Sequence, residues 1–236
     1  MNGKLILFPV PIGAEDIHVS LPSHNIELLN SCATFIVEEV RTARRFLKYA
    51  GYQRAIDDTT FLPLNEHTQE SEIAEYLDPI FQGQNIGLLS EAGLPCIADP
   101  GAMITRMAQR KGIEIMPLVG PSSLLLALMA SGFNGQNFAF VGYLPVKGPD
   151  RQRVIRNLEA RAYKENQTQI FIEAPYRNNQ MLADLSDTLN PQSLICIAAD
   201  ITLSTQQIIT RTAAQWKKTR EQINLHKRNT VFLIYR

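Results

Sequence analysis

Cysteine and histidine are few in this sequence, and the ones present are scattered. Cys32, Cys96 and Cys196 lie far apart and form no CxxC pair, which excludes a disulfide framework and a cysteine-rich zinc site. None of the four histidines stands at metal-ligand spacing from a cysteine or from another histidine. We therefore expect no bound metal, and a reducing compartment, the cytoplasm, as the location.

Long apolar runs and a surplus of either charge are also missing. The longest apolar run, residues 124–130, is far shorter than the roughly 20 residues of a membrane-spanning helix, and the start is too short for a secretory signal. We therefore expect no membrane partner. Lysine plus arginine and aspartate plus glutamate both number 23, which argues against long-range capture of nucleic acid as the main source of affinity.

The charges are nevertheless spread unevenly. Residues 1–117 carry 9 basic and 15 acidic side chains, and residues 118–236 carry 14 and 8. Such asymmetry indicates either that one half faces a polyanion or that two halves or two subunits attract each other. The basic helix predicted over 150–164 has the same two interpretations, a solvated face or a polyanion contact. Its cations are Arg151, Arg153, Arg156, Arg161 and Lys164.

Three common nucleotide and hydrolase motifs are absent. No GxGxxG follows the first predicted strand, no GxxxxGK[ST] occurs, and no GxSxG elbow occurs. These absences argue against the usual dinucleotide fingerprint, a P-loop and an α/β-hydrolase nucleophile. A sequence without metal or nucleophile motifs, but with several loops of small residues, favours group transfer from an already activated carrier.

The sequence does contain a regular alternation of strand and helix patterns. Over residues 1–118 each buried strand pattern is followed by a helix pattern, which predicts a doubly wound, mostly parallel sheet. One predicted helix spans residues 70–81, with apolar residues at helical spacing. Over residues 119–236 strands follow one another with fewer helices, which predicts a mixed sheet. We therefore predict two α/β domains, 1–118 and 119–236, with the boundary where the charge balance changes sign.

The connection after the predicted strand 86–89 is unusually long. Ordinary strand-to-helix connections take about 2–6 residues, whereas this one takes eleven, 90–100, with one glycine, two prolines and two acids. Such a loop outside the carboxyl end of a strand is where open α/β sheets bind ligands. The alternative is an ordinary connection. A second loop of small residues, 119–123, leads directly into an apolar helix.

Several ordered segments together resemble the tetrapyrrole-methylase superfamily of S-adenosylmethionine-dependent methyltransferases. They are FPVPIG (8–13), EEVR (38–41), GLLSEAGLPCIADPG (87–101), VGPSS (119–123), FVGYLP (140–145) and FIEAPYR (171–177). Within that superfamily they are most similar to the branch that 2′-O-methylates a cytidine ribose in 16S ribosomal RNA. The resemblance implies two α/β domains with S-adenosylmethionine in the cleft between them, usually a homodimer, and 16S rRNA or the small ribosomal subunit as a possible partner.

The resemblance also implies which residues bind the cofactor. They are Pro9, Pro11, Ile12, Gly13, Gly93, Leu94, Pro95, Ser122, Ser123, Glu173, Ala174, Tyr176, Ala198, Asn229 and Thr230. Glycines and backbone groups at such positions allow a ligand to approach closely, and apolar walls suit its adenine and methionine parts.

An acceptor hydroxyl benefits from a carboxylate that takes its proton, and Glu38 and Glu91 are the candidates. For Glu91 the alternative role is an acceptor that structures the loop. Arg41, Tyr143 and Arg177 are candidates for gripping the substrate, with packing or a buried ion pair as the alternative.

At several substrate-side positions the sequence departs from the ribosomal branch. Glu91 and Leu94 replace its usual Asp and Thr, and Glu39-Val40 replaces Asp-Thr. The methyl acceptor therefore stays open among three interpretations: an RNA ribose, a tetrapyrrole or other small molecule, or no acceptor at all in a non-catalytic cofactor-binding protein.

Overall fold

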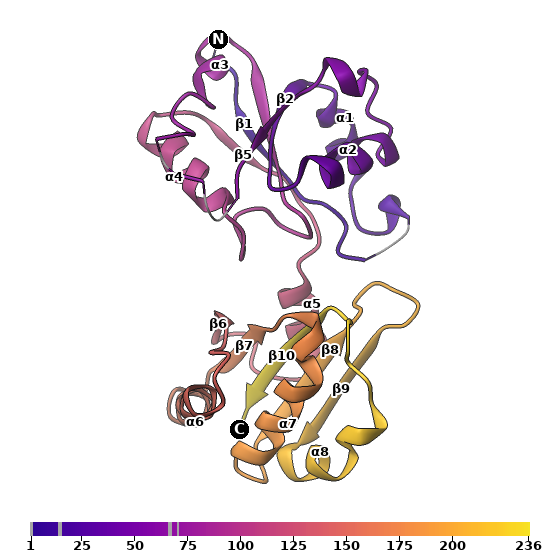
Figure 1. The fold of residues 1–236 in the computed structure, drawn as a ribbon, viewed down its shortest axis with the longest axis vertical. Coiled ribbons are helices and arrows are strands. Elements are labelled where there is room, and N and C mark those ends of the chain that lie inside the picture. Colours follow the sequence, from indigo (N-terminus) through magenta and orange to yellow (C-terminus); the bar gives the residue numbers. More distant parts are fainter. Residues whose placement is uncertain (1, 14–15, 66–67, 70) are drawn as a thin grey trace. The chain divides into compact units, whose positions relative to one another are not determined.

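The computed structural model describes residues 2–13, 16–65, 68–69 and 71–236. The chain forms two compact units, Met1–Ser122 and Ser123–Arg236, each built around its own sheet (Figure 1). The division falls inside the small-residue loop 119–123 that leads into the first helix of the second unit.

The first unit contains a five-stranded sheet in which every neighbouring pair is parallel. Its strands, in spatial order, are β3 (Thr60–Pro63), β2 (Cys32–Val37), β4 (Asn85–Leu89), β1 (Leu5–Phe8) and β5 (Ile115–Pro117). The near-continuous apolar sequences of β1, β2 and β4 are those of strands buried on both faces. The prediction of a doubly wound parallel sheet is confirmed.

Helices cover both faces of this sheet (Figure 1). Helices α1 (Ser23–Leu29) and α2 (Val40–Tyr49) belong to one apolar cluster, and α3 (Asp78–Phe81) and α4 (Gly101–Arg110) belong to the other. Because successive side chains of a strand point to opposite faces, Leu88 joins the α3–α4 cluster and Leu89 the α1–α2 cluster. The last residue of β4 therefore points toward α2. Single 3₁₀ turns at Ile17–Val19 and Ile56–Asp58 complete this unit.

The second unit contains a mixed five-stranded sheet, as predicted. Its order is β6 (Phe138–Tyr143), β7 (Thr168–Ile172), β10 (Thr230–Tyr235), β8 (Leu194–Ala199) and β9 (Gln207–Thr212). Only β6 and β7 are parallel, and the other three neighbouring pairs are antiparallel.

Helices α6 (Gly148–Glu165), α7 (Asn178–Thr188) and α8 (Ala213–Thr219) share one large apolar cluster with this sheet. A capping box starts α8: the Thr212 side chain accepts from the Gln215 backbone N–H, and the Gln215 side chain accepts from the Thr212 backbone N–H. The single tryptophan, Trp216, is fully buried and donates to the Ile195 carbonyl at 2.9 Å. Helix α5 (Ser123–Ser131) contacts β8, β9 and β10, and 3₁₀ turns occur at Pro175–Arg177 and Arg220–Gln222.

The prediction of one long helix over residues 70–81 was wrong. Residues 71–77 form successive turns and only Asp78–Phe81 is α-helical, while Glu70 lies outside the described residues. The hydrogen bonds Tyr76 N to Ile73 O and Ile80 N to Leu77 O span three residues, and Pro79 has no N–H to give. The apolar spacing was informative all the same, because Ile73, Leu77 and Ile80 are fully buried.

One cation of the predicted basic helix is not at the surface. Arg151 is 4% exposed, and its guanidinium pairs with Asp184 at 2.7 Å and donates to the Pro145 carbonyl at 2.9 Å. It holds the start of α6 against α7 and is not available to a polyanion. Among the described residues, no helix is both long and apolar enough to cross a membrane.

Candidate active site

The exits of three parallel strands are joined at the carboxyl edge of the first sheet. Val10, after β1, and Gly93, after β4, exchange backbone hydrogen bonds of 3.0 and 3.1 Å. Gly93 has φ +74°, and a Cβ there would lie 3.1 Å from Ile12 Cγ2 and 3.2 Å from the Pro121 carbonyl oxygen. The loop after β5 therefore reaches the same point as the loops after β1 and β4. Only glycine combines this backbone conformation with so close an approach.

A second contact joins the same loops. A Cβ on Gly120 would lie 2.2 Å from Cβ of the buried Pro9, so the backbone of the β5 exit lies directly on the β1 exit. The loops thus meet through glycine backbone, and the predicted cofactor-binding residues of the first unit come together here. They are Pro9, Pro11, Ile12, Gly13, Gly93, Leu94, Pro95 and Ser122. Ser123 is the first residue of α5 in the second unit.

The long loop after β4 is held by its own side chains. Ser90 Oγ donates to the Gly93 carbonyl at 2.9 Å, and Asp99 Oδ1 accepts from the backbone N–H groups of Cys96 and Gly101 at 2.8 Å each. Burial raises the pKa of Asp99, while the two hydrogen bonds act in the opposite direction. Cys96 has φ +70°, a conformation that this bonding maintains. Asp99 therefore structures the turn.

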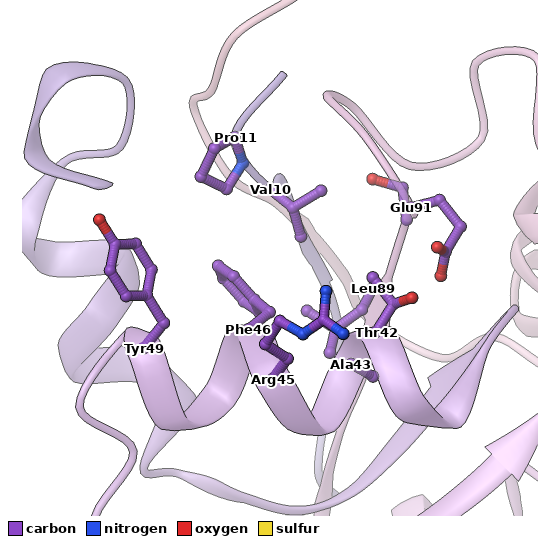
Figure 2. A pocket seen from close by; sticks show the side chains of 10 residues that line it. Val10, Pro11, Thr42, Ala43, Arg45, Phe46, Tyr49, Leu89 and Glu91 are labelled. Atoms are coloured by element: carbon purple, nitrogen blue, oxygen red, sulfur yellow. The ribbon is translucent and has the colours of Figure 1, made fainter. Parts of the chain in front are cut away.

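A pocket of about 280 Å³ lies beside this loop, entirely within the first unit (Figure 2). We call it the α2 pocket. It is lined by Val10, Pro11, Thr42, Ala43, Arg45, Phe46, Tyr49, Leu89, Ser90 and Glu91. In Figure 2 the α2 side chains rise toward the β1 exit, with Tyr49 at one end of the pocket and Glu91 at the other.

Glu91 is exposed on the rim of this pocket. Its carboxylate and the Arg45 guanidinium form no hydrogen bond or ion pair within the described part of the chain. A charged group that the protein leaves to solvent at a pocket rim is open to a ligand.

The structure does not bring Glu38 into the α2 pocket. Glu38 is exposed at the exit of β2 and lines a smaller depression with Leu64, Asp99 and Gly101. Arg41 is exposed in the first turn of α2, where its backbone N–H donates to the capping Glu39 carboxylate at 3.0 Å. Of the two candidate carboxylates, only Glu91 lines the larger pocket.

One edge of the second sheet gathers the remaining predicted residues. The register places the ends of β6 and β7 beside the start of β10 and the end of β8, through the pairs Tyr143–Ile172, Ile172–Val231 and Thr230–Ala199. The predicted residues at this edge are Tyr143, Glu173, Ala174, Tyr176, Arg177, Ala198, Asn229 and Thr230. Ala198 is fully buried inside β8, whereas Tyr143 and Tyr176 are exposed.

Glu173 is the buried centre of this edge. Its side chain is fully buried, and Oε1 accepts from Arg177 Nη2 at 2.7 Å and from the Ala174 N–H at 2.7 Å. The hydrogen bond with Glu173 raises the pKa of Arg177. Arg177 also donates to the Tyr176 hydroxyl at 2.7 Å. Glu173 Oε2 is buried and has no hydrogen-bond partner in the part of the chain that the structure describes. A buried carboxylate oxygen normally has a partner, so Oε2 is available to a donor from a ligand.

Sequence reasoning missed two features. The first is the Arg228–Asp200 ion pair of 2.7 Å, which joins the β10 entry to the β8 exit, while the Asn178 amide at the start of α7 donates to the Arg228 carbonyl. The second is the α2 wall of the pocket. Neither Phe46 nor Tyr49 was predicted as a site residue, although Tyr49 is 53% exposed. An aromatic residue three positions after Phe46 on a basic helix was the available signal.

The fold of the chain is similar to that of two solved structures named as methyltransferases. The chain superposes on the crystal structure of the methyltransferase CobJ with a TM-score of 0.62, at 16% identity, over 99% of this chain and 94% of that one. For uroporphyrin-III-C-methyltransferase from Thermus thermophilus the TM-score is 0.58, at 15% identity, over 100% and 93%. These two similarities show the fold.

The sequence defines the family. Residues 10–216 match the family model of the tetrapyrrole (corrin/porphyrin) methylases. A protein named ribosomal RNA small subunit methyltransferase I from Thermotoga maritima is 31% identical over 201 residues, 85% of this chain and 84% of that protein. Its namesake from Pseudomonas aeruginosa is 29% identical over 206 residues, 87% and 69%. The chain belongs to the tetrapyrrole methylase family and is a methyltransferase that depends on S-adenosylmethionine, the methyl donor of the family.

The residues at both sheet edges fit this cofactor. Glu173 Oε2 is a buried acceptor without a donor, and S-adenosylmethionine carries ribose hydroxyls and an ammonium group that donate. The joined glycine loops of the first unit present backbone rather than side chains, which permits close approach of a ligand.

Proposed function

We propose that the protein 2′-O-methylates a ribose of 16S ribosomal RNA. The proposal is supported by the similarity to proteins named ribosomal RNA small subunit methyltransferase I, which extends over 85–90% of this chain. The observation that carries it is the α2 pocket, in which Glu91, a carboxylate without a partner among the described residues, stands with an arginine and two aromatic side chains.

The role of Glu91 follows from the chemistry of a hydroxyl acceptor. When bound, S-adenosylmethionine supplies a methyl group attached to a positively charged sulfur. When an oxygen takes the methyl group, the carbon–sulfur bond breaks and the sulfur becomes a neutral thioether. The ribose oxygen must lose its proton as the new bond forms, and the Glu91 carboxylate accepts that proton. Alignment of the two reactants supplies most of the rate, since well-oriented reactions gain roughly 7–11 kcal/mol from positioning.

The rigid loops perform this alignment. Gly93 ties the loop that carries Glu91 to the exits of β1 and β5, and Ser90 Oγ fixes the turn next to Glu91. At the other sheet, Glu173 Oε2 would accept a hydrogen bond from the cofactor, and Arg177 orients the Glu173 carboxylate by donating to its Oε1. Each of these groups positions a reactant, and only Glu91 exchanges a proton.

The test uses small ribosomal subunits, and separately 16S rRNA, from a strain that lacks the gene for this protein. Purified protein and methyl-labelled S-adenosylmethionine should place label on one 2′-oxygen, located by alkaline resistance of the neighbouring phosphodiester. Label that enters an added tetrapyrrole and no RNA would contradict the proposal.

Glu91→Gln tests the base directly. A positioned acid–base group contributes about 10²–10⁴-fold to a rate, so kcat should fall by at least about 100-fold while the Kd for the cofactor stays unchanged. Glu91→Asp, which keeps a carboxylate, should retain much more activity and the wild-type pH profile. Equal activity of Glu91→Gln and wild type would exclude Glu91 as the base.

A further inference from the structure

We propose that the α2 pocket receives the base of the acceptor nucleotide, unstacked from its neighbours, and that cations of α2 hold the adjoining phosphates. This inference rests on the proposed RNA methylation and adds to it the residues that select the acceptor. It assigns stacking to Tyr49 and Phe46 and a phosphate contact to Arg45.

The size of the pocket favours one small ring system. Pockets for drug-sized ligands hold about 300–1,000 Å³, and the α2 pocket, at about 280 Å³, lies just below that range. A nucleobase is one or two fused rings, whereas a tetrapyrrole has four pyrrole rings with acidic side chains. The pocket therefore suits a base better than a macrocycle.

The walls of the pocket suit a flat, partly polar ring. Val10, Ala43 and Leu89 are buried and form an apolar floor. Phe46 and Tyr49 add two aromatic rings from successive turns of α2 (Figure 2). Proteins that bind single-stranded RNA stack its bases on aromatic rings and arginine planes, and this pocket offers both.

Tyr49 is exposed to an unusual degree for a pocket aromatic. The residue is 53% exposed, and its hydroxyl forms no hydrogen bond with any residue that the structure describes. The protein therefore gains little from packing this ring, which is free to cover an inserted base.

The charge of α2 is opposite to that of the unit around it. Residues 1–117 carry 9 cations and 15 acids, yet α2, with ten residues, contains four of those cations and no acid: Arg41, Arg44, Arg45 and Lys48. Arg44 pairs with Asp57 outside the pocket. Arg41 and Arg45 lie four residues apart, where like charges destabilise a helix. Arg41, Arg45 and Lys48 have no acidic partner among the described residues, and such cations beside an aromatic pocket match a phosphate backbone with a base turned out of it.

The experiment measures binding of a short, fluorescently labelled single-stranded RNA whose sequence surrounds the nucleotide methylated in the assay above. Tyr49→Ala should weaken RNA binding about 5- to 150-fold, the range that base stacking on an aromatic ring provides. Tyr49→Phe, which keeps the ring, should bind like wild type.

The arginines of α2 provide a matched pair. Arg45→Gln should lower the slope of log affinity against log salt by about 0.7, the value for one phosphate contact on a single strand. Arg44→Gln, one residue away but paired with Asp57, should leave that slope unchanged. Cofactor affinity should stay at the wild-type value in all four variants, because the α2 pocket takes the acceptor.

Three results would overturn this inference. If wild type methylates RNA but Tyr49→Ala and Arg45→Gln bind RNA as wild type does, the pocket assignment fails and the proposed function stands. Loss of cofactor affinity in Tyr49→Ala would assign the pocket to the cofactor instead. If no RNA is methylated and a tetrapyrrole competes for the pocket, the proposed function and this inference fail together.

Discussion

Replacement of Gly93 by alanine tests whether the close contact of three loops at this glycine contributes to stability and to cofactor binding. The new Cβ would lie 3.1 Å from Ile12 Cγ2 and 3.2 Å from the Pro121 carbonyl oxygen, and φ is +74°. One methyl group thus acts on the exits of β1, β4 and β5 together. Gly112→Ala is the matched control, because Gly112 has φ +67° and its new Cβ would meet nothing within 4 Å.

The two variants separate backbone strain from crowding. A left-handed conformation costs a non-glycine residue about 1–2 kcal/mol, and this applies to both variants. Gly93→Ala must in addition displace a neighbour, and overpacking of this kind costs about 1–3 kcal/mol. We therefore expect Gly93→Ala to lower the free energy of unfolding of the first unit by about 2–5 kcal/mol, and Gly112→Ala by about 1–2 kcal/mol.

The assay has to report on the first unit. The only tryptophan, Trp216, lies in the second unit, so its fluorescence does not follow the sheet beside Gly93. Amide hydrogen exchange in β1 and β4 reports the opening of that sheet directly. Isothermal titration with S-adenosylmethionine measures the functional effect, and Gly93→Ala should weaken binding while Gly112→Ala leaves it unchanged.

Equal results for the two variants would refute the reasoning. If exchange in β1 and β4 speeds up equally in both, the close approach at Gly93 has no energetic weight. If Gly93→Ala binds the cofactor like wild type despite its lower stability, the joined loops are structural and the cofactor lies elsewhere.

Two further predictions concern charged groups of the second unit. Arg177→Ala should lower its free energy of unfolding by about 3–5 kcal/mol, because the fully buried Glu173 carboxylate loses its counter-ion; Trp216 fluorescence in urea measures this, and a loss below about 1 kcal/mol would contradict it. Asp187→Asn should have a small effect, about 0.2–1 kcal/mol, because the pair with Arg220 is partly exposed. The hydrogen bond from Arg220 lowers the pKa of Asp187. The contribution of this ion pair to stability is therefore present at neutral pH and should disappear as the pH falls below 3.8, the ordinary pKa of an aspartate. A difference between wild type and Asp187→Asn that persists in stronger acid would be inconsistent with this assignment.

The sequence predicted both sheets because their signals are local. The buried apolar runs of β1, β2 and β4 and the capping box at Thr212 depend on residues within a few positions of one another. The prediction of a helix over 70–81 was wrong because apolar spacing does not distinguish a helix from successive turns. Its apolar spacing reports which side chains are buried, and turns that bury Ile73, Leu77 and Ile80 satisfy that spacing as well as a helix does.

The candidate site was predictable only where it is made of loops. The eleven-residue connection after β4 is visible as an excess of glycine, proline and acids, and it lies where that pattern placed it. The bond between Val10 and Gly93 was not predictable, because it joins residues 83 positions apart through backbone atoms. The burial of Arg151 was not predictable for the same reason, because its ion-pair partner, Asp184, is distant in the sequence.

The division between backbone contacts and side-chain contacts also bears on specificity. The loops of the first unit meet through glycines and main-chain hydrogen bonds, so most of their side chains can change without loss of the arrangement. That agrees with a fold shared with CobJ at 16% identity. The α2 pocket, in contrast, takes the side chains of Arg45, Phe46 and Tyr49 from one helix. If this pocket receives the acceptor as proposed, substitutions on this face of α2 change the acceptor while the glycine contacts between the loops stay as they are. Acceptor selection should therefore respond to exchange of the α2 face, and cofactor affinity should not.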